Sequence, residues 1–250
     1  MVFEFSGKTA FITGGVNGIG REVTNGIIAG GGHVIVTDID VTNGEKFVKE
    51  LGEGNYFYKM DVGNPEEIRE VIEEVTSKHK VDILINVAGI ISACSFDELT
   101  DKEWERTLRI NLTGVFTTIS AFYPKFKEQG GARIVNVSSV AGKLGGGLLG
   151  TAAYASSKAG VNGLTKAVAK EGGKFGISCN AVCPSFTHTS MTTSLSEDKE
   201  KNDKVISMIP LGRAAEPVEI AQMILFFASE AASFVNGEIG DCDGGIVMDG

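Results

Sequence analysis

Tyr154 and Lys158 are the residues of this sequence best suited to acid–base chemistry. They stand four apart in residues 151–170, a stretch rich in small residues that predicts a helix, so both side chains share one face. A tyrosine has an ordinary pKa of about 10, and a nearby ammonium lowers it by favouring the phenolate. The pair therefore predicts a proton donor and acceptor, although the same spacing also arises by chance on protein surfaces.

A glycine-rich turn lies between a predicted strand, residues 9–13, and a helix predicted from Arg21. A strand that ends in glycines and opens a helix directs free backbone N–H groups at an anion, and the pyrophosphate of a dinucleotide fits this arrangement. The residues expected to bind it are Gly14, Asn17, Gly18, Ile19 and Gly20. A purely structural turn is the alternative, because the spacing is GxxxGxG and not the commoner GxGxxG.

Asp38 ends a second predicted strand, residues 33–38, close to the distance from the glycine turn at which an acid meets the adenosine ribose. A carboxylate there accepts two hydroxyl hydrogen bonds and repels a 2′-phosphate. We therefore expect NAD as the cofactor, with NADP less favoured. In the alternative interpretation, Asp38 caps a helix that starts near Val41.

The elements that position these residues alternate short β-branched runs with longer amphipathic stretches, a pattern typical of a parallel sheet covered on both faces. We predict one doubly wound α/β domain over residues 1–250, with a flap at about 186–210 over the site. The polar residues 194–203 within it suit a surface helix, a loop or a mobile cover. Strands are predicted at residues 9–13, 33–38, 55–60, 83–86, 133–137, 178–183 and 238–242, and one helix at 65–80 with Asn64 as its cap.

Composition excludes several classes of function. The net charge of −9 disfavours nucleic acid and acidic membranes as partners. The four cysteines lack CxxC spacing, which suits reduced thiols in a cytoplasm, and we expect neither a signal peptide nor a membrane span. The three histidines have no ligand spacing between them, so we expect no metal site.

Taken jointly, these motifs resemble the classical short-chain dehydrogenase/reductase family over essentially the whole chain. The resemblance rests on TGGVNGIG at 13–20, NVAG at 86–89, YASSK at 154–158 and DGG at 243–245. It implies a single Rossmann domain with a seven-stranded sheet. It also implies hydride transfer between a nicotinamide cofactor and a secondary alcohol or ketone.

The resemblance implies roles for individual residues. Tyr154 would be the acid/base, Lys158 would lower its pKa and bind the nicotinamide ribose, and Ser139 would hydrogen-bond the substrate oxygen. Asn111 would hold a water that links Lys158 to solvent, which is compatible with a helix-kinking role. Further cofactor contacts implied are Asp61, Val62, Asn86, Ala88, Gly89, Ser185, Thr187 and Thr189.

The sequence departs from the family pattern at three places. Ser185 replaces a glycine, Val87 replaces an asparagine, and the interval from Ser139 to Tyr154 is longer than usual, with the extra length in residues 143–150. We predict a locally remodelled substrate pocket there.

Substrate specificity is expected from residues 91–96, 140–150 and 186–208, whose larger side chains are mostly apolar: Cys94, Phe96, Leu144, Leu148, Leu149, Phe186, Met191 and Leu195. They favour a hydrophobic or cyclic substrate such as a hydroxysteroid. The acidic net charge weighs against acyl carrier protein or coenzyme A as partners. The alternatives are reduction of a 3-oxoacyl thioester with NADPH, and a regulator that senses NAD(H) without turnover. A homotetramer is expected by family analogy, through the helix that carries Tyr154 and the apolar run 223–228.

Overall fold

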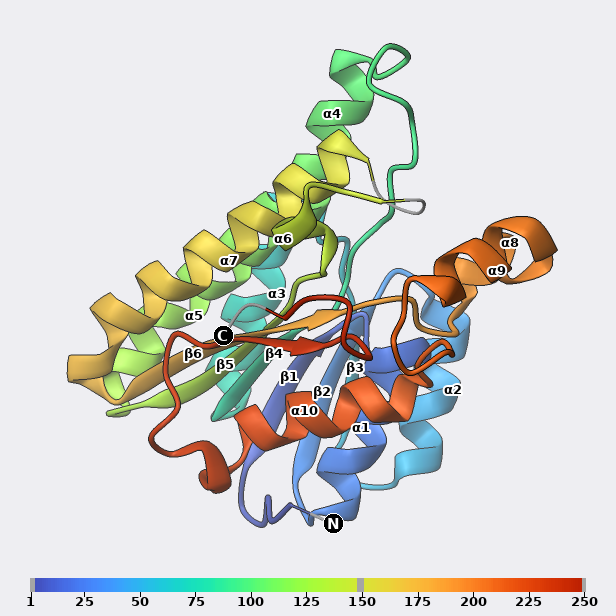
Figure 1. Ribbon diagram of the computed structural model, residues 1–250. Helices are drawn as coiled ribbons and strands as arrows, with labels where there is room; N and C mark the ends of the chain where they lie inside the picture. Colours follow the sequence, from blue (N-terminus) through green and yellow to red (C-terminus); the bar gives the residue numbers. More distant parts are fainter. Residues whose placement is uncertain (1–2, 148–150, 249–250) are drawn as a thin grey trace.

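The computed structural model describes residues 3–147 and 151–248, and its centre is one sheet of seven parallel strands. The strand order is β3-β2-β1-β4-β5-β6-β7 (Figure 1). The strands are β1 (Thr9–Thr13), β2 (His33–Asp38), β3 (Tyr56–Lys59), β4 (Ile83–Asn86), β5 (Ala132–Val137), β6 (Ile177–Pro184) and β7 (Ile239–Cys242). This confirms the predicted single α/β domain and the position of every predicted strand to within one or two residues.

Helices cover both faces of the sheet (Figure 1). One apolar core lies between the strands and α1 and α10, and a second lies between the strands and α3, α5 and α7. The helices are α1 (Gly18–Ala29), α2 (Val41–Leu51), α3 (Pro65–Lys78), α4 (Asp101–Leu108), α5 (Gly114–Glu128), α6 (Ala141–Leu144), α7 (Ala152–Gly172), α8 (Thr193–Glu197), α9 (Lys199–Ser207) and α10 (Pro217–Ala228). Four shorter helical turns are η1 (Arg109–Thr113), η2 (Gly173–Phe175), η3 (Ser190–Thr192) and η4 (Glu230–Ala232).

Local sequence explains the helix boundaries near the site. The side chain of Asn64 accepts hydrogen bonds from the backbone N–H groups of Glu66 and Glu67, so the predicted cap of α3 is confirmed. The cap of α2 is Asp40, which accepts from Asn43 N at 3.1 Å. The alternative in which Asp38 caps this helix is therefore wrong; Asp38 Oδ1 accepts from Asp40 N at 3.2 Å, and the residue lines the cavity described below.

The strand order reverses between β1 and β4, so the connections that follow these two strands leave toward opposite faces of the sheet. Ligands of doubly wound sheets bind at the carboxyl ends of the strands beside such a reversal. The segment between β6 and α10 folds there as η3, α8 and α9, with its own apolar cluster of Phe186, Leu195, Val205, Ile209 and Ala214. None of the helices in residues 3–147 and 151–248 has the length and apolar character needed to cross a membrane.

Candidate active site

A cavity of about 710 Å³ opens at the carboxyl ends of the strands and brings together most of the residues singled out from the sequence. Those that line it are Gly14, Asn17, Gly18, Ile19, Asp38, Asp61, Val62, Ala88, Gly89, Ser139, Tyr154, Lys158, Ser185, Thr187 and Thr189. Gly20, Asn86 and Asn111 are not part of the lining.

Gly20 and Asn86 lie behind the residues that line the cavity and support them. A side chain at Gly20 would place a Cβ only 2.0 Å from the Gly14 oxygen, so this glycine allows the turn to close on α1. Asn86 is buried; its Nδ2 donates to Asn136 Oδ1 at 2.9 Å and its Oδ1 accepts from Thr118 at 2.8 Å. Its amide is thus used within the core, at the end of β4.

The glycine turn has the shape and donors that a pyrophosphate needs. Gly14 and Gly18 have φ values of +65° and +52°, a conformation that side chains disfavour. Asn17 precedes α1 but makes no side-chain cap, which leaves the first backbone N–H groups of the helix free to face the cavity. The residues present therefore fit a dinucleotide, with the phosphates at the start of α1.

Asp38 lies at the end of β2 on the same cavity, next to Ile39, which is 67% exposed. Asp61, after β3, also lines the cavity, and its Oδ1 accepts from Gly63 N at 2.7 Å. These positions suit an adenosine whose ribose meets Asp38 and whose base lies against Ile39.

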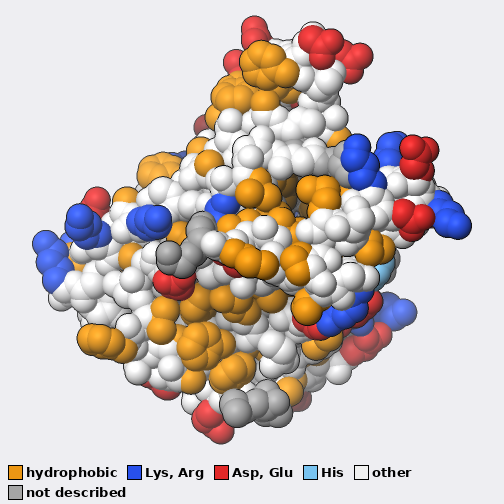
Figure 2. All heavy atoms as spheres, in the orientation of Figure 1, with side chains coloured by type: hydrophobic (Ala, Val, Ile, Leu, Met, Phe, Trp, Pro, Cys, Tyr) orange, Lys and Arg blue, Asp and Glu red, His pale blue; other side chains and the backbone are white. Residues whose placement is uncertain are grey.

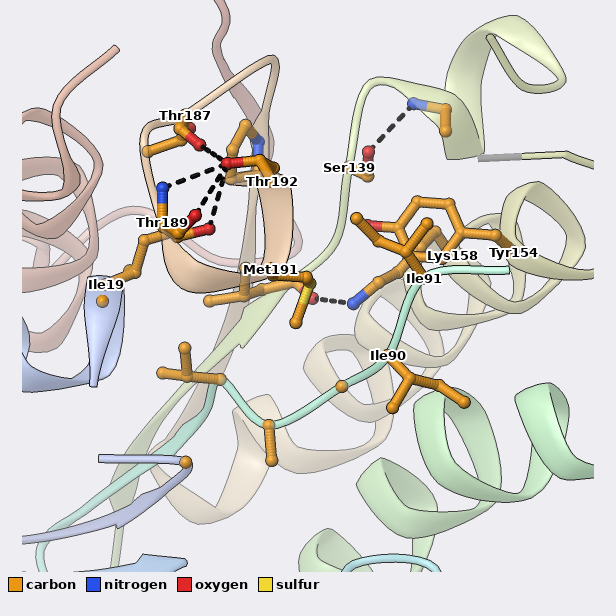
Figure 3. Close-up of a pocket in the computed structure, with 18 of the residues that line it drawn as sticks. Ile19, Ile90, Ile91, Ser139, Tyr154, Lys158, Thr187, Thr189, Met191 and Thr192 are labelled. Atoms are coloured by element: carbon orange, nitrogen blue, oxygen red, sulfur yellow. Dashed lines mark hydrogen bonds between the residues drawn. The ribbon is translucent and has the colours of Figure 1, made fainter. Parts of the chain in front are cut away.

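The reacting groups come from β5 and α7, and Figure 3 shows Tyr154, Lys158 and Ser139 at one side of the cavity. Lys158 is only 4% exposed; its Nζ donates to the Val137 oxygen at 2.8 Å and lies 5.8 Å from the centre of the Tyr154 ring. Ser139 follows β5, and its Oγ accepts from Ala141 N at 3.1 Å. The hydroxyl of Ser139 and the phenol of Tyr154 therefore face the same cavity.

Burial governs the protonation of this pair. It lowers the pKa of Lys158 to about 8 and raises the pKa of Tyr154 above its ordinary value, while a side-chain hydrogen bond with Ser139 acts in the lowering direction. The sequence predicted a lowered tyrosine pKa. In the chain without cofactor that prediction is wrong, because loss of hydration of the phenolate outweighs any help from the lysine.

Asn111 lies on η1, a turn of π-helix within an otherwise α-helical run, which agrees with the helix-kinking role considered from the sequence. Its Oδ1 accepts from Ile90 N at 2.8 Å, and its Nδ2 donates to Ile90 O at 2.9 Å and to Ser157 Oγ at 3.1 Å. The side chain thus ties the segment after β4 to α7. These contacts of Asn111 do not by themselves define the position of a water beside Lys158.

A network of threonines organises the other side of the cavity (Figure 3). The Thr192 hydroxyl contacts the Thr187 oxygen at 2.6 Å and accepts from Thr189 N at 3.1 Å. Ser185, which stands where the family has glycine, keeps a negative φ and donates to the Asp243 oxygen at 2.9 Å. The substitution therefore anchors the segment to the C-terminal turn without backbone strain. Val87, the second departure, still donates its N–H to Thr13 Oγ1 at 3.1 Å.

The expected specificity residues divide into two groups. Leu144, Phe186 and Met191 line the cavity, whereas Cys94, Phe96 and Leu195 do not. Phe96 is 81% exposed and Leu195 is buried in the cluster beneath α8 and α9. Leu148 and Leu149 lie outside the described residues.

Several lining residues were missed from the sequence, among them Arg106, Arg109 and Ile246, and two others, Val205 and Met208, lie in the predicted specificity segment 186–208 but were not singled out. They come from α4, η1, α9 and the chain after β7, which meet only in the folded molecule. A periodicity analysis of residues 193–209 would have pointed to Val205, since it faces the apolar cluster with Phe186. No comparable signal marks the two arginines.

Comparison with known proteins gives a consistent assignment. A family model described as Enoyl-(Acyl carrier protein) reductase matches residues 14–247. The chain is 40% identical to the 3-oxoacyl-[acyl-carrier-protein] reductase FabG of Thermotoga maritima, over 98% of this chain and all of that one. It is 36% identical to the acetoacetyl-CoA reductase of Shinella zoogloeoides, over 95% of this chain and 98% of that one.

A solved structure shares the fold over its full length. The gluconate 5-dehydrogenase of Burkholderia cenocepacia, in complex with NADP and tartrate, superposes with a TM-score of 0.91 at 29% identity. The match covers 98% of this chain and 97% of that one.

Proposed function

Because this chain belongs to the short-chain dehydrogenase/reductase family, we propose that it is a nicotinamide-dependent reductase of 3-oxoacyl thioesters. The observation that carries the proposal is full-length identity of 40% with a 3-oxoacyl-[acyl-carrier-protein] reductase, in a chain whose Ser139, Tyr154 and Lys158 meet on one cavity. The hydroxysteroid expected from the sequence has no support among the relatives described above. The thioester, first weighed as an alternative, replaces it.

The net charge of −9 argued against an acidic carrier as partner, and this argument does not decide the matter. Net charge governs long-range encounter, whereas docking depends on the local surface. Two positively charged side chains, Arg106 and Arg109, line the cavity itself.

The geometry supports a simple division of work during reduction. A bound dihydronicotinamide supplies the hydride to the keto carbon. Ser139 donates a hydrogen bond to the keto oxygen, a contribution of about 3 kcal/mol for one well-placed donor. Tyr154 then gives its proton to that oxygen, and its raised pKa keeps the phenol protonated at neutral pH for this purpose.

Asp38 supports NADH as the preferred cofactor. Its carboxylate lines the cavity at the end of β2 and would repel a 2′-phosphate at the ribose. The gluconate 5-dehydrogenase described above binds NADP, so the preference needs a direct measurement.

The test measures kcat/KM with NADH and NADPH on acetoacetyl-CoA, a 3-oxoacyl N-acetylcysteamine thioester, a cyclic ketone and 5-ketogluconate, with Tyr154→Phe as the background control. We expect both thioesters to be reduced best, and with NADH. Reduction of the cyclic ketone or of 5-ketogluconate in preference to both thioesters would overturn the proposal. NADH binding without turnover of any substrate would instead support a sensor. A sensor would not need the full set of reacting groups.

We also propose a homotetramer by analogy with the family, to be tested by light scattering. The run Met223–Ala228 contributes less to such a surface than expected, because Ile224, Leu225 and Phe227 pack into the chain's own core. Phe116 on α5 and Phe234 after η4, which are 50% and 103% exposed, are the better candidates.

A further inference from the structure

Three large apolar side chains at the mouth of the cavity are unusually exposed. Leu144, Met191 and Met208 line the same cavity, and they are 53%, 47% and 52% exposed. Figure 2 shows apolar side chains around the hollow on this face of the molecule. Apolar surface gathered around a concave site indicates a part of the molecule that a ligand covers.

The cavity wall behind these three side chains is a packed apolar cluster joined to the turn after β7. Phe186 and Val205 belong to the apolar cluster beneath α8 and α9, and Ile246 packs against it. Leu211 N donates to Gly244 O at 3.1 Å, so the end of the flap is joined to the turn that follows β7. We call Leu144, Phe186, Met191, Val205, Met208 and Ile246 the acyl bay.

The acyl bay is continuous with the reacting groups. Leu144 ends α6, the short helix that starts at Ala141, two residues after Ser139. Met191, on η3, lines the same cavity as Tyr154 and Lys158, and all three are labelled in Figure 3. A substrate whose keto oxygen meets Ser139 and Tyr154 would therefore run its next carbons along the bay.

The bay side chains are apolar, and the hydroxyl nearest to them in the chain is engaged elsewhere. The Thr192 hydroxyl is held by the Thr187 oxygen at 2.6 Å and by the backbone N–H of Thr189. Arg106 and Arg109 also line the cavity, but they come from α4 and η1 and are not bay residues; Arg106 Nη1 lies 3.6 Å from Glu103 Oε2. A polyhydroxylated acid would find few partners among the bay residues, whereas a hydrocarbon chain needs none.

We propose that the acyl bay binds the hydrocarbon chain of the thioester, so that the substrate is a 3-oxoacyl thioester of six or more carbons. This rests on the proposed function and specifies its substrate. Burying one methylene contributes a factor of up to about four in affinity. The value of kcat/KM should therefore rise with chain length until the bay is filled.

The experiment uses 3-oxoacyl N-acetylcysteamine thioesters of four, six, eight and ten carbons at saturating cofactor. The wild-type chain should gain at least tenfold in kcat/KM from four to eight carbons. Leu144→Ser and Met208→Ser should each remove most of that gain through a higher KM. Leu211→Ser is the matched control, because Leu211 is 69% exposed and is not among the residues that line the cavity.

The outcomes separate the two proposals. Equal kcat/KM for all four chain lengths would overturn the acyl bay and leave the thioester reductase standing. The same holds if Leu211→Ser lowers the gain as much as Met208→Ser. Failure to reduce any thioester, with cofactor binding intact, would overturn the proposed function and the acyl bay together. Cofactor affinity, measured by fluorescence in each variant, shows that the chains are folded.

Discussion

The ammonium of Lys158 donates to the main-chain oxygen of Val137 at 2.8 Å, the last residue of β5, and lies 5.8 Å from the centre of the Tyr154 ring. The lysine is thus held by the sheet and not by the phenol. Burial lowers the pKa of the lysine to about 8 and raises that of the tyrosine, so at neutral pH the lysine still carries its proton and the phenol keeps its own. The positive nicotinamide ring of the oxidised cofactor would add a second positive charge and lower the pKa of the tyrosine.

Tyr154 should therefore titrate at different pH values with and without cofactor. The ultraviolet difference spectrum between the wild type and Tyr154→Phe should show a phenolate pKa above 10 in the free chain and a lower one with NAD⁺. Tyr154→Phe should bind NADH normally and lose about 10²- to 10⁴-fold in turnover. A variant with near wild-type turnover would remove Tyr154 from the acid/base role.

Lys158 should make stability depend on pH in a defined window. Its pKa is about 8 in the folded chain and 10.5, the ordinary value for lysine, in the unfolded chain, so between these values the unfolded chain binds more protons and the free energy of unfolding rises with pH. The full effect is about 3 kcal/mol.

Denaturant titrations of the wild type and of Lys158→Met between pH 7 and 11 isolate this contribution. The wild type should gain stability relative to the variant as the pH rises from 8 to 10.5, the window of the two pKa values. A difference independent of pH would mean that the buried amine keeps its ordinary pKa.

The sequence predicted the fold and the glycine turn of the cavity well, because both depend on local patterns. The seven strands, the cap at Asn64 and the glycine turn were found from residue type and spacing alone. Tyr154 and Lys158 were paired correctly because one helix carries both.

What the sequence did not predict depends on distant contacts. The raised pKa of Tyr154 follows from its burial in the folded chain, and no local pattern reports it. Likewise, Leu195 and Phe186 come from the same segment and are both apolar, yet only Phe186 lines the cavity. Which side of a short helix faces a site depends on the elements packed against it.

Asp38 should control cofactor choice. Asp38→Ala should weaken NADH binding and raise the ratio of NADPH to NADH in kcat/KM at least tenfold, because it removes both ribose hydrogen bonds and the repulsion of a 2′-phosphate. Asp40→Ala is the control, since Asp40 caps α2 and is not among the lining residues. An unchanged ratio in Asp38→Ala would leave the preference for NADH without a structural basis.

Lys143 and Asp241 should act as a positioning pair for Ser139. Lys143 Nζ lies 2.7 Å from Asp241 Oδ2 and donates to Ile239 O at 3.2 Å, with side chains only 15% and 17% exposed. The pair joins α6, which follows Ser139, to β7. A Cβ at Gly142 would lie 2.7 Å from the Lys158 carbonyl carbon, so α6 also packs closely against α7, the helix that carries the lysine.

Lys143→Met should therefore lower kcat for thioester reduction several-fold while the NADH affinity stays constant, and Lys143→Arg should restore most of the loss. Breaking a largely buried ion pair removes the attraction between its charges, so Lys143→Met and Asp241→Asn should each cost stability, and their double-mutant cycle should show a coupling of about 1 kcal/mol or more. A role confined to stability would lower the melting temperature without changing kcat at a temperature where the variant is folded. Equal kcat in Lys143→Met and wild type under that condition would separate α6 from the placement of Ser139.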